Sequence, residues 1–428
     1  MSSELIKNIN EKNFNETANL PGIIVIDFYS TQCPPCDALA PKFEKAAEIF
    51  RGQAAFYKIF RQENRELAEK LGVKSSPTVL LYKNGKEAGN RLSGAVKFKD
   101  LLDGISSLGA RYEKLSPVKS EYDIMIIGGG PAGLSAALYS AQAKLKTVII
   151  DQALPGGQMA VTHQVSNFPG FPEPVAGYML AHYFGEQAAR AGVHTRFAAD
   201  LDFFNAAEKT AGINGYEIIH AEKIIIASGA SPRPLGIPGE MEFRGKGISY
   251  CATCDAKYYE NKKVIVIGGG NSAVEEALFI AKFASEITIV HQFDVLQANK
   301  TACEKAFSEP KIKFLFNHEP RAFRRTACGM EAEVENLKDK TRKIIGADGI
   351  FVFIGMIPNT GFINGMETDQ YGSIKVNQDM KTTAPGIFAA GDCIIKKYRQ
   401  ITTAVSDGTI AALAAIKELE YNKQEESL

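Results

Sequence analysis

The sequence has no excess of either charge and no long apolar run. Lysine plus arginine and aspartate plus glutamate both number 49, so the formal net charge of the 428-residue chain is zero. Nothing therefore points to nucleic acid or to an anionic membrane as a partner. No apolar stretch approaches the ~18 residues of a membrane span, and residues 1–8 lack the apolar segment of a signal peptide. We therefore expect a cytoplasmic protein with no membrane partner.

Cysteine is scarce, yet its spacing is informative. The 7 cysteines include Cys33-x-x-Cys36 (the first Cys pair) and Cys251-x-x-Cys254 (the second Cys pair), a spacing that indicates redox or metal chemistry. Zinc is the alternative, but both pairs flank α/β patterns and no histidine lies nearby at ligand spacing. Because cytoplasmic thiols cycle rather than stay oxidised, the two pairs predict a dithiol relay and no metal.

The first Cys pair lies between a strand and a helix. Residues 22–30 are apolar and rich in β-branched side chains, and a helix is expected from about 37 to 50. The unpaired N–H groups and positive dipole end of a helix N-terminus favour the thiolate, which is the species that attacks a disulfide. We expect Cys33 to be the nucleophile and Cys36 to be the resolving thiol.

Residues 1–105 resemble thioredoxin. The resemblance rests on a strand that carries Asp27, the first Cys pair, the following helix, and Ser76-Pro77 before a strand and hairpin. It implies that Pro77 is cis and lies against the Cys pair, and that Asp27 is a buried carboxyl that helps to take the proton of the resolving thiol. The sequence departs from thioredoxins at Gln32, usually Trp, and at the Pro-Pro dipeptide. A domain used only for docking is the alternative, against which the two retained sulfurs argue.

A first nucleotide-binding loop follows a polar, aperiodic segment at 106–120 that predicts a linker. Residues 122–133 place a buried strand before Gly128-x-Gly130-x-x-Gly133 and a helix, so that the backbone can meet a pyrophosphate at the helix N-terminus. The next strand ends on Asp151, at about the ~20-residue offset of the acid that binds a ribose hydroxyl. This context favours a dinucleotide site over a simple tight turn.

A second glycine-rich loop predicts a second dinucleotide. Residues 263–273 read KVIVIGGGNSA and lead through a helix to a strand at 286–290. Downstream, the apolar run 386–392 ends in Gly391-Asp392, which in flavoproteins with two dinucleotides places the acid against the ribityl and pyrophosphate of FAD. This assigns FAD to the first loop.

Residues 120–420 resemble low-molecular-weight thioredoxin reductase, of the family that includes the flavoprotein subunit of alkyl hydroperoxide reductase. The resemblance rests on both glycine loops, on Gly156-Gly157-Gln158-Met159, on the second Cys pair with Asp255, on Gly391-Asp392 and on Arg399-Gln400. It implies an α/β homodimer with a thioredoxin fold and two Rossmann-like domains. The expected parts are a thioredoxin-like domain at 1–105, a linker at 106–120, FAD-binding parts at 121–239 and 350–428, and an inserted NAD(P)-type domain at 240–349.

The resemblance also assigns roles to residues. Cys254 would face the flavin, Cys251 would exchange with the partner disulfide, and Asp255 would be the general acid and base rather than only an exposed acid at a helix start. The expected FAD contacts are Gly128, Gly130, Pro131, Ala132, Gly133, Asp151, Gly157, Gln158, Asn167, Gly391, Asp392, Arg399 and Gln400. The expected nicotinamide-nucleotide contacts are Gly268, Gly270, Asn271, Ser272, Ala273 and His291.

The segment after residue 290 favours NADH over NADPH. Relatives that use NADPH carry His-Arg-Arg and a third Arg four residues later, whereas residues 291–297 here read HQFDVLQ. Each charge-assisted hydrogen bond lost from a 2′-phosphate is worth ~1.5 to 3 kcal/mol. NADH is favoured by elimination, because neither His291 nor Gln292 is the acid that NADH-specific relatives usually carry. A ferredoxin donor is the alternative, although the intact second loop argues for a bound dinucleotide.

Together these features predict a flavin-dependent thioredoxin-disulfide reductase fused to its own thioredoxin. Electrons would pass from NADH through FAD and the second Cys pair to the first Cys pair, and then to protein disulfides of a peroxiredoxin or another thioredoxin-like protein. A dithiol oxidase that reduces oxygen is a second hypothesis, against which the fused thioredoxin-like domain argues. A non-enzymatic adaptor is a third, against which intact Cys251, Cys254 and Asp255 argue.

Overall fold

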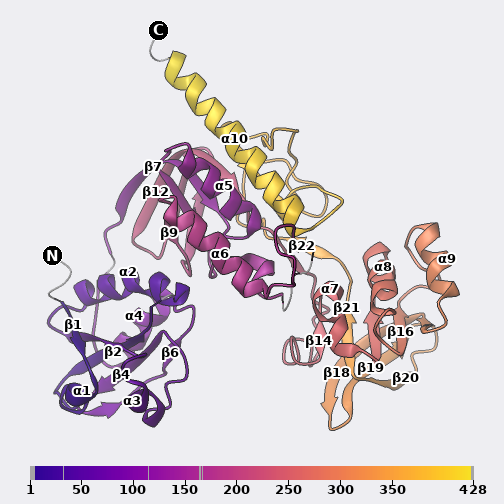
Figure 1. Cartoon of the computed structure of the whole chain (residues 1–428), viewed down its shortest axis with the longest axis horizontal. Helices are drawn as coiled ribbons and strands as arrows, with labels where there is room; N and C mark the ends of the chain where they lie inside the picture. The colour runs from indigo at the N-terminus through magenta and orange to yellow at the C-terminus, as the bar shows by residue number, and fades with distance from the viewer. Residues whose placement is uncertain (1–4, 32, 114, 163–164, 166, 426–428) are drawn as a thin grey trace. The chain divides into compact units, whose positions relative to one another are not determined.

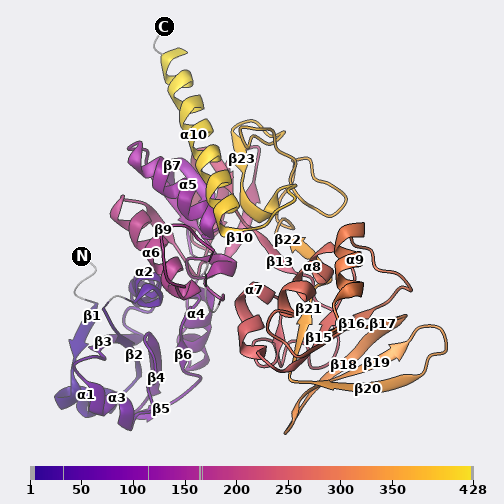
Figure 2. The same cartoon turned by 45° about the vertical axis from the view of Figure 1, so that its right-hand side comes forward.

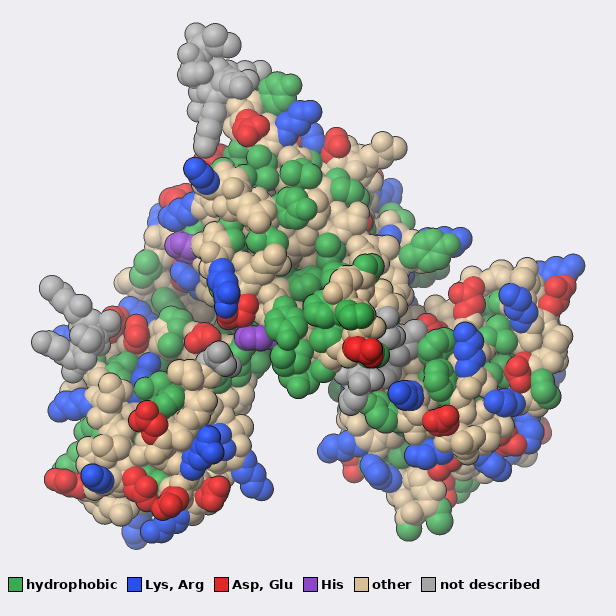
Figure 3. Space-filling model, viewed as in Figure 1, with side chains coloured by type: hydrophobic (Ala, Val, Ile, Leu, Met, Phe, Trp, Pro, Cys, Tyr) green, Lys and Arg blue, Asp and Glu red, His purple; other side chains and the backbone are tan. Residues whose placement is uncertain are grey.

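The computed structural model describes residues 5–31, 33–113, 115–162, 165 and 167–425, without the side chains of 253–254 and 422–425 (Figure 1). The chain forms two compact units. The first comprises residues 1–160, 178–229 and 359–428, and the second comprises 161–177 and 230–358. Charged side chains of both signs are interspersed on the face drawn in Figure 3, in keeping with the balanced composition.

The first unit begins with a mixed sheet covered by helices on both faces. Alternate residues of strand β2 point to opposite faces, so Ile23 and Val25 join the core under α2 and α4, whereas Ile24, Ile26 and Phe28 join the core under α1 and α3. The sheet order is β1-β3-β2-β4-β5, with β6 beside β4. The elements are β1 (Ile6–Ile9), α1 (Glu11–Ala18), β2 (Ile23–Tyr29), α2 (Pro34–Ile49), β3 (Ala54–Phe60), α3 (Arg65–Lys70), β4 (Thr78–Lys83), β5 (Lys86–Glu87), β6 (Leu92–Ser93) and α4 (Phe98–Ser107).

Residues 108–117 connect α4 to the second sheet. Two reciprocal hydrogen bonds of 2.8 Å join the Gln53 side chain to the backbone of Arg111. The Tyr112 ring meets Phe50 edge to face, with ring centroids 5.7 Å apart. This connecting segment therefore has contacts with the thioredoxin-like part.

The second sheet of this unit is mostly parallel. Its order is β10-β11-β12-β7-β8-β9, and β23 pairs with β12. Helices α5 and α10 pack closely because Gly408 leaves no side chain where a Cβ atom would lie 2.0 Å from the carbonyl oxygen of Ala132. The elements are β7 (Val118–Ile127), α5 (Pro131–Gln142), β8 (Thr147–Ile150), η2 (Gly157–Met159), α6 (Gly177–Arg190), β9 (His194–Arg196), β10 (Leu201–Asn205), β11 (Thr210–Ile213), β12 (Glu217–Ile226), β23 (Ile387–Ala389), η4 (Gly391–Cys393) and α10 (Ile401–Glu425).

The second unit contains a five-stranded parallel sheet, in the order β14-β21-β15-β16-β17, and an antiparallel sheet, in the order β18-β19-β20 (Figure 2). The chain enters and leaves near the paired strands β13 (Ala230–Pro232) and β22 (Met356–Pro358). The other elements are β14 (Ile248–Ser249), α7 (Ala252–Asp255), η3 (Ala256–Tyr259), β15 (Lys263–Ile267), α8 (Asn271–Ile280), β16 (Glu286–His291), α9 (Lys300–Ser308), β17 (Ile312–Phe316), β18 (His318–Thr326), β19 (Gly329–Asn336), β20 (Arg342–Ala347) and β21 (Gly349–Val352).

These two units confirm the predicted α/β fold with a thioredoxin-like part and two dinucleotide-binding folds. Within the described part of the chain, every helix is too short or too polar to span a bilayer.

Candidate active site

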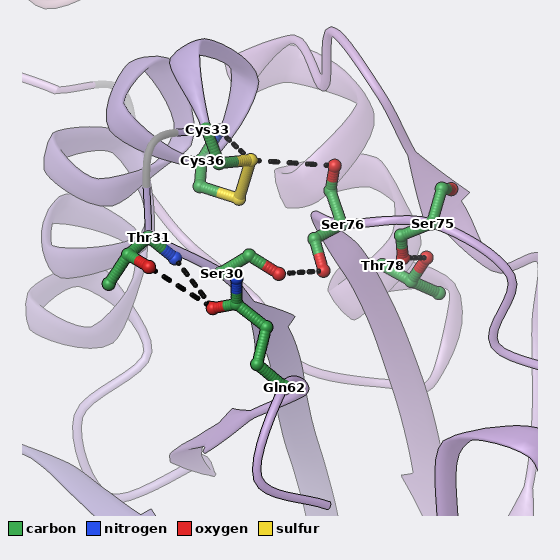
Figure 4. The surroundings of a disulfide bond; sticks show 8 residues. All are labelled: Ser30, Thr31, Cys33, Cys36, Gln62, Ser75, Ser76 and Thr78. Carbon is green, nitrogen blue, oxygen red and sulfur yellow. Dashed lines mark hydrogen bonds between the residues drawn. A yellow bond between two sulfur atoms is a disulfide. The ribbon is translucent and has the colours of Figure 1, made fainter. Parts of the chain in front are cut away.

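The first Cys pair forms a disulfide at the N-terminus of α2 (Figure 4). Cys33 is the residue that caps the helix, and its sulfur accepts a hydrogen bond of 3.3 Å from the backbone N–H of Cys36. Pro34 fits the first helical position because it has no N–H to leave unpaired. After reduction, the same N–H and the helix dipole would stabilise a Cys33 thiolate.

The loop before β4 lies against this disulfide. The Ser76–Pro77 peptide bond is cis, as the resemblance implied. The carbonyl oxygen of Ser76 lies 3.5 Å from the sulfur of Cys33, and the Ser76 hydroxyl accepts a hydrogen bond of 2.8 Å from Ser30 (Figure 4). Sequence reasoning missed Ser30, because a serine three residues before a Cys pair carries no signal of its own.

Asp27 is a buried carboxyl on the face of β2 that α2 covers. It follows Ile23 and Val25 in the alternation of the strand and is 2% exposed. Burial raises its pKa to about 7, although the charge of Lys58 acts in the opposite direction. Its Oδ1 atom has no hydrogen-bond partner among the described residues. A carboxyl with this pKa can give or take a proton near neutral pH. Gln32, the predicted departure from thioredoxins, lies outside the described residues.

Three segments of the first unit converge on the first glycine loop. At Gly128, with φ +115°, a Cβ atom would lie 2.2 Å from the carbonyl oxygen of Ala227, so only glycine fits. A Cβ atom on Gly157 would lie 3.2 Å from the Cα of Gly130, and one on Gly391 would lie 2.9 Å from the Cβ of Ala132. The predicted segments around the loop, 157–158 and 391–392 are therefore brought together.

The loop leaves room for a phosphate. A Cβ atom on Gly130 would meet nothing within 4 Å, and this residue caps α5, whose first helical position is Pro131. A Cβ atom on Gly133 would lie 1.8 Å from the carbonyl oxygen of Gly128, so the third glycine holds the helix against the loop. An open backbone at a helix N-terminus fits the pyrophosphate of FAD.

Asp151 has backbone partners. One carboxylate oxygen accepts from the N–H of Gly129, and the other accepts from the N–H of Ala153 at 2.7 Å. Burial raises the pKa of Asp151, and these two hydrogen bonds lower it. The side chain therefore holds the glycine loop in shape, a contact that its predicted ribose role did not include.

Asp392 fits the polar part of a flavin nucleotide. Its Oδ1 atom is buried and has no hydrogen-bond partner among the described residues, as is also true of Nε of Arg399. Burial raises the pKa of Asp392, while the charges of Lys396 and Arg399 lower it. Hydroxyl and phosphate groups would satisfy both orphaned atoms. Gln158, Asn167 and Gln400 are exposed.

The second unit repeats the glycine loop. A Cβ atom on Gly268 would lie 2.3 Å from the carbonyl oxygen of Phe353, whereas Gly270 faces open space at the start of α8. Ala273 is fully buried where the first loop has its third glycine. Asn271 and Ser272, in the first turn of α8, are exposed. This geometry fits a second dinucleotide.

His291 ends β16 directly beside this loop, because a Cβ atom on Gly269 would lie 2.4 Å from the His291 ring. Its Nε2 atom is buried without a partner among the described residues, and burial lowers its pKa, so the neutral ring is favoured. The N–H of Gln297 donates to the carbonyl oxygen of Gly269 at 2.7 Å. The segment predicted to decide nucleotide preference is therefore attached to the loop.

The second Cys pair opens α7. Cys251 is half-buried, caps the helix and is disulfide-bonded; the side chain of Cys254 lies outside the described residues. The Ser249 hydroxyl accepts from the N–H of Cys251 at 3.1 Å and donates to the carboxylate of Asp255 at 2.6 Å. Ser249 thus joins Asp255 to Cys251. Sequence reasoning missed Ser249, since only its position two residues before the Cys pair could have indicated it.

A disulfide in a thioredoxin-like part, a second disulfide-bonded cysteine and two dinucleotide loops define the class of flavin disulfide oxidoreductases. Comparison with known proteins agrees. The pyridine nucleotide-disulphide oxidoreductase family matches residues 122–408, and the thioredoxin family matches residues 5–107.

Several relatives match over almost their whole length. The thioredoxin reductase of Peptoclostridium acidaminophilum is 43% identical over 316 residues, which cover 72% of this chain and 100% of the relative. A 34.2 kDa protein in the rubredoxin operon of Clostridium pasteurianum is 42% identical, over 70% of this chain and 97% of its own. The crystal structure of thioredoxin reductase from Streptococcus pyogenes has a TM-score of 0.61 and 37% identity, and covers 70% of this chain and 99% of its own.

The chain belongs to the pyridine nucleotide-disulphide oxidoreductase family, as a homologue of thioredoxin reductases with a thioredoxin domain joined at its N-terminal side. It is an FAD-dependent disulfide oxidoreductase, and the family implies a nicotinamide nucleotide as the second cofactor.

Proposed function

We propose that the chain reduces its own thioredoxin domain. Electrons pass from a reduced nicotinamide nucleotide, through FAD and the second Cys pair, to the first Cys pair and then to protein disulfides. The observation that supports this relay is the complete thioredoxin site, with Cys33 at a helix N-terminus beside Ser76–Pro77, in the same chain as two dinucleotide loops. FAD would be held by the first glycine loop and Asp392, and when bound it would supply the two-electron chemistry between the nicotinamide and the second Cys pair.

The thiol exchange needs two disulfide steps. In the first, the Cys251 thiolate attacks the sulfur of Cys33, the Cys33–Cys36 bond breaks, and Cys36 leaves with the electron pair and takes a proton. In the second, Cys254 attacks Cys251, which restores the second disulfide and releases Cys33 as a thiolate. Asp27, with a pKa raised to about 7, supplies the proton to Cys36. Asp255, held by Ser249, takes the proton of Cys251.

We propose NADH as the preferred donor. The segment 292–297 follows His291 and is tied to the second glycine loop through Gln297, which supports the assignment, made from the resemblance, of its side chains to the 2′-phosphate side of the nucleotide. Gln292, Phe293 and Gln297 are exposed and uncharged, and the neutral form of His291 is favoured. A dianionic phosphate would therefore find no cation in this segment. If a ferredoxin were the donor, electrons would follow the same relay from FAD onwards, and the second glycine loop would not be used.

We propose protein disulfides as the final acceptors, such as those of an oxidised peroxiredoxin or another thioredoxin-like protein. Backbone groups of the loop at Ser76–Pro77 lie beside the Cys33 sulfur, where an extended substrate segment can pair with them. The relatives named thioredoxin reductases act on thioredoxin, which corresponds to the first Cys pair of this chain, so the final acceptors are proposed from the thioredoxin site alone. We also propose a homodimer and the domain limits given by the resemblance.

The relay is tested by trapping its mixed disulfide. The double variant Cys36→Ser with Cys254→Ser leaves Cys33 and Cys251 as the exchanging sulfurs. When Cys33 is first converted to a mixed disulfide with thionitrobenzoate, the free Cys251 thiolate should attack the Cys33 sulfur and release thionitrobenzoate. Non-reducing peptide mapping should find the Cys33–Cys251 linkage, and the matched control Cys33→Ser with Cys254→Ser should lack it. Accumulation of other linkages at equal levels in both double variants would refute the relay order.

A further inference from the structure

Lys42, in the middle of α2, is buried although it has no carboxylate partner within hydrogen-bonding distance in the described part of the chain. The side chain is 3% exposed, and its ammonium donates to the carbonyl oxygens of Val96 at 3.0 Å and Ala198 at 2.6 Å. Val96 belongs to the thioredoxin domain. Ala198 lies in the same compact unit, within the FAD-binding part proposed for residues 121–239 and 350–428. A buried ammonium is costly unless acceptors surround it, so the FAD-binding part supplies an acceptor that Lys42 needs.

Burial lowers the pKa of Lys42 to about 8, the nearby charge of Asp200 raises it, and that of Lys97 lowers it. A lowered pKa is expected for an ammonium group that is removed from solvent. It agrees with the burial of Lys42 and its short contact to Ala198.

An ion pair lies next to this buried lysine. The ammonium of Lys97, the residue before α4, lies 2.6 Å from the carboxylate of Asp200. The backbone of Asp200 is itself held, because its N–H donates to the side chain of Asn214 at 3.0 Å and its carbonyl accepts from the N–H of Asn214 at 2.9 Å. Two backbone hydrogen-bonding groups of Asp200 are therefore fixed at the open end of the β10–β11 hairpin.

An aromatic side chain of the FAD-binding part completes the contact. Tyr216 packs against the core under α2 and α4, and its ring meets Phe98 edge to face with centroids 4.9 Å apart. The ammonium of Lys45 lies 5.8 Å from the centre of the same ring. Such aromatic and cation–π contacts add to the burial of the ring itself.

At the other end of α2, the charges oppose contact. Asp37 follows the first Cys pair directly, and burial together with the negative charge of Glu186 on α6 raises its pKa. Like charges repel, so this pair does not favour contact. The attraction between the two parts is therefore concentrated away from the disulfide.

We propose that the thioredoxin domain carries a second interaction surface, separate from its disulfide, with which it docks reversibly on the FAD-binding part of its own chain. This docking surface consists of Lys42, Lys45, Lys97 and Phe98, and its counterpart consists of Ala198, Asp200 and Tyr216. Lys42 lies nine residues after Cys33, or about 13 Å along a helix. One helix therefore carries both the redox end and the docking end.

The test is a charge reversal with its compensating partner. Asp200→Lys places like charges together, and Lys97→Glu with Asp200→Lys restores an ion pair of opposite polarity. The readouts are the rate of limited proteolysis within residues 108–117 and the radius of gyration from small-angle scattering, both on the full FAD-loaded chain. We expect Asp200→Lys to be cleaved at least fivefold faster and to expand, and the double variant to return to the unmodified values.

The control is Glu367→Lys, which breaks the exposed Lys375–Glu367 pair of 3.3 Å in the same FAD-binding part. It should change neither readout, and circular dichroism and flavin content establish that each variant is folded. An Asp200→Lys variant as compact and protease-resistant as the unmodified chain would overturn the proposal, as would a double variant as labile as the single one. Insulin reduction driven by dithiothreitol reports on the first Cys pair alone, so a failed relay is distinguished from failed docking.

Discussion

Asp27 stands opposite Lys58 in the parallel register of β2 and β3, yet this cation does not keep the carboxyl ionised. The Lys58 ammonium lies 5.8 Å from the centre of the Phe43 ring. Asp27 is 2% exposed, and the penalty for burying its charge outweighs the attraction of Lys58. The Asp27 carboxyl therefore changes its protonation state near neutral pH.

This carboxyl should make the thioredoxin domain less stable as the pH rises. The pKa of Asp27 is raised from 3.8 to about 7, so the folded domain keeps a proton that the unfolded chain has lost. The protonated Asp27 carboxyl contributes roughly 4 kcal/mol to the free energy of unfolding below pH 4. This contribution is lost as the pH rises to about 7. Asp27→Asn should abolish this slope between pH 5 and pH 8, as measured by urea-dependent hydrogen exchange of peptides from residues 5–107. Equal slopes in both proteins would contradict the assignment.

Ser30 should position the loop that faces the Cys33 sulfur. Its hydroxyl donates to Ser76, whose carbonyl oxygen lies 3.5 Å from that sulfur. Ser30→Ala removes one hydrogen bond, worth about 1 kcal/mol, and should slow dithiothreitol-driven insulin reduction about fivefold. The pKa of the reduced Cys33, measured from the pH dependence of alkylation, should shift with it. Ser30→Thr keeps the hydroxyl and should behave as the unmodified chain, and an unchanged Ser30→Ala would show that the contact has no role.

Ser249 should act through Asp255. Because its hydroxyl donates to that carboxylate at 2.6 Å, Ser249→Ala should slow thiol exchange by the second Cys pair about tenfold, the effect of losing ~1.5 kcal/mol from a hydrogen bond to a charged group. Reduction of the flavin by the nicotinamide should keep its rate, since no thiol takes part in that step. Stopped-flow absorbance separates flavin reduction from thiol exchange. Asp255→Asn is the reference for complete loss of the Asp255 carboxylate, and Ser249→Thr should restore thiol exchange. Equal slowing of both phases would indicate a general structural defect instead.

Nucleotide preference should follow the segment 292–297. Anaerobic mixing with equal low concentrations of NADH, NADPH and a reduced ferredoxin should bleach the flavin fastest with NADH. Arginine at Gln292, Phe293 and Gln297 should raise the rate with NADPH at least tenfold, because one charge-assisted hydrogen bond to the 2′-phosphate already supplies about 1.4 kcal/mol. Asp294→Asn removes a negative charge from the same segment without adding a cation and serves as the control. Faster bleaching of the unmodified protein by NADPH would contradict the charge argument.

Local patterns predicted the backbone of the sites well. The strand that contains Asp27, the helix after Cys33 and both glycine loops were predictable, because each depends on neighbours within about fifteen residues. The pairing of Ser30 with Ser76 was not, since these residues are 46 positions apart and a serine is compatible with any exposed loop. Asp151 shows an intermediate case: its position after a strand was predicted, but its two backbone donors were not.

Lys42 was the least predictable of the important residues. A lysine in a helix that covers a sheet ordinarily reaches solvent, whereas here two carbonyl groups, supplied 54 and 156 residues later, accept from the buried ammonium. No periodicity in the sequence encodes a contact of that separation. The same holds for Tyr216, which looks like an ordinary turn residue before β12 but packs against the core of another domain.

The segment between Ser107, where α4 ends, and Val118, where β7 begins, limits how far the thioredoxin domain can move from the rest of the chain. Fully extended, ten residues reach ~35 Å, so an undocked thioredoxin domain would stay within a small sphere around its anchor. Confinement of this kind corresponds to a local concentration in the millimolar range. An enzyme that must find a separate thioredoxin slows as the two proteins are diluted, whereas under the proposed relay electron transfer inside this chain would proceed at the same rate at any concentration of the protein.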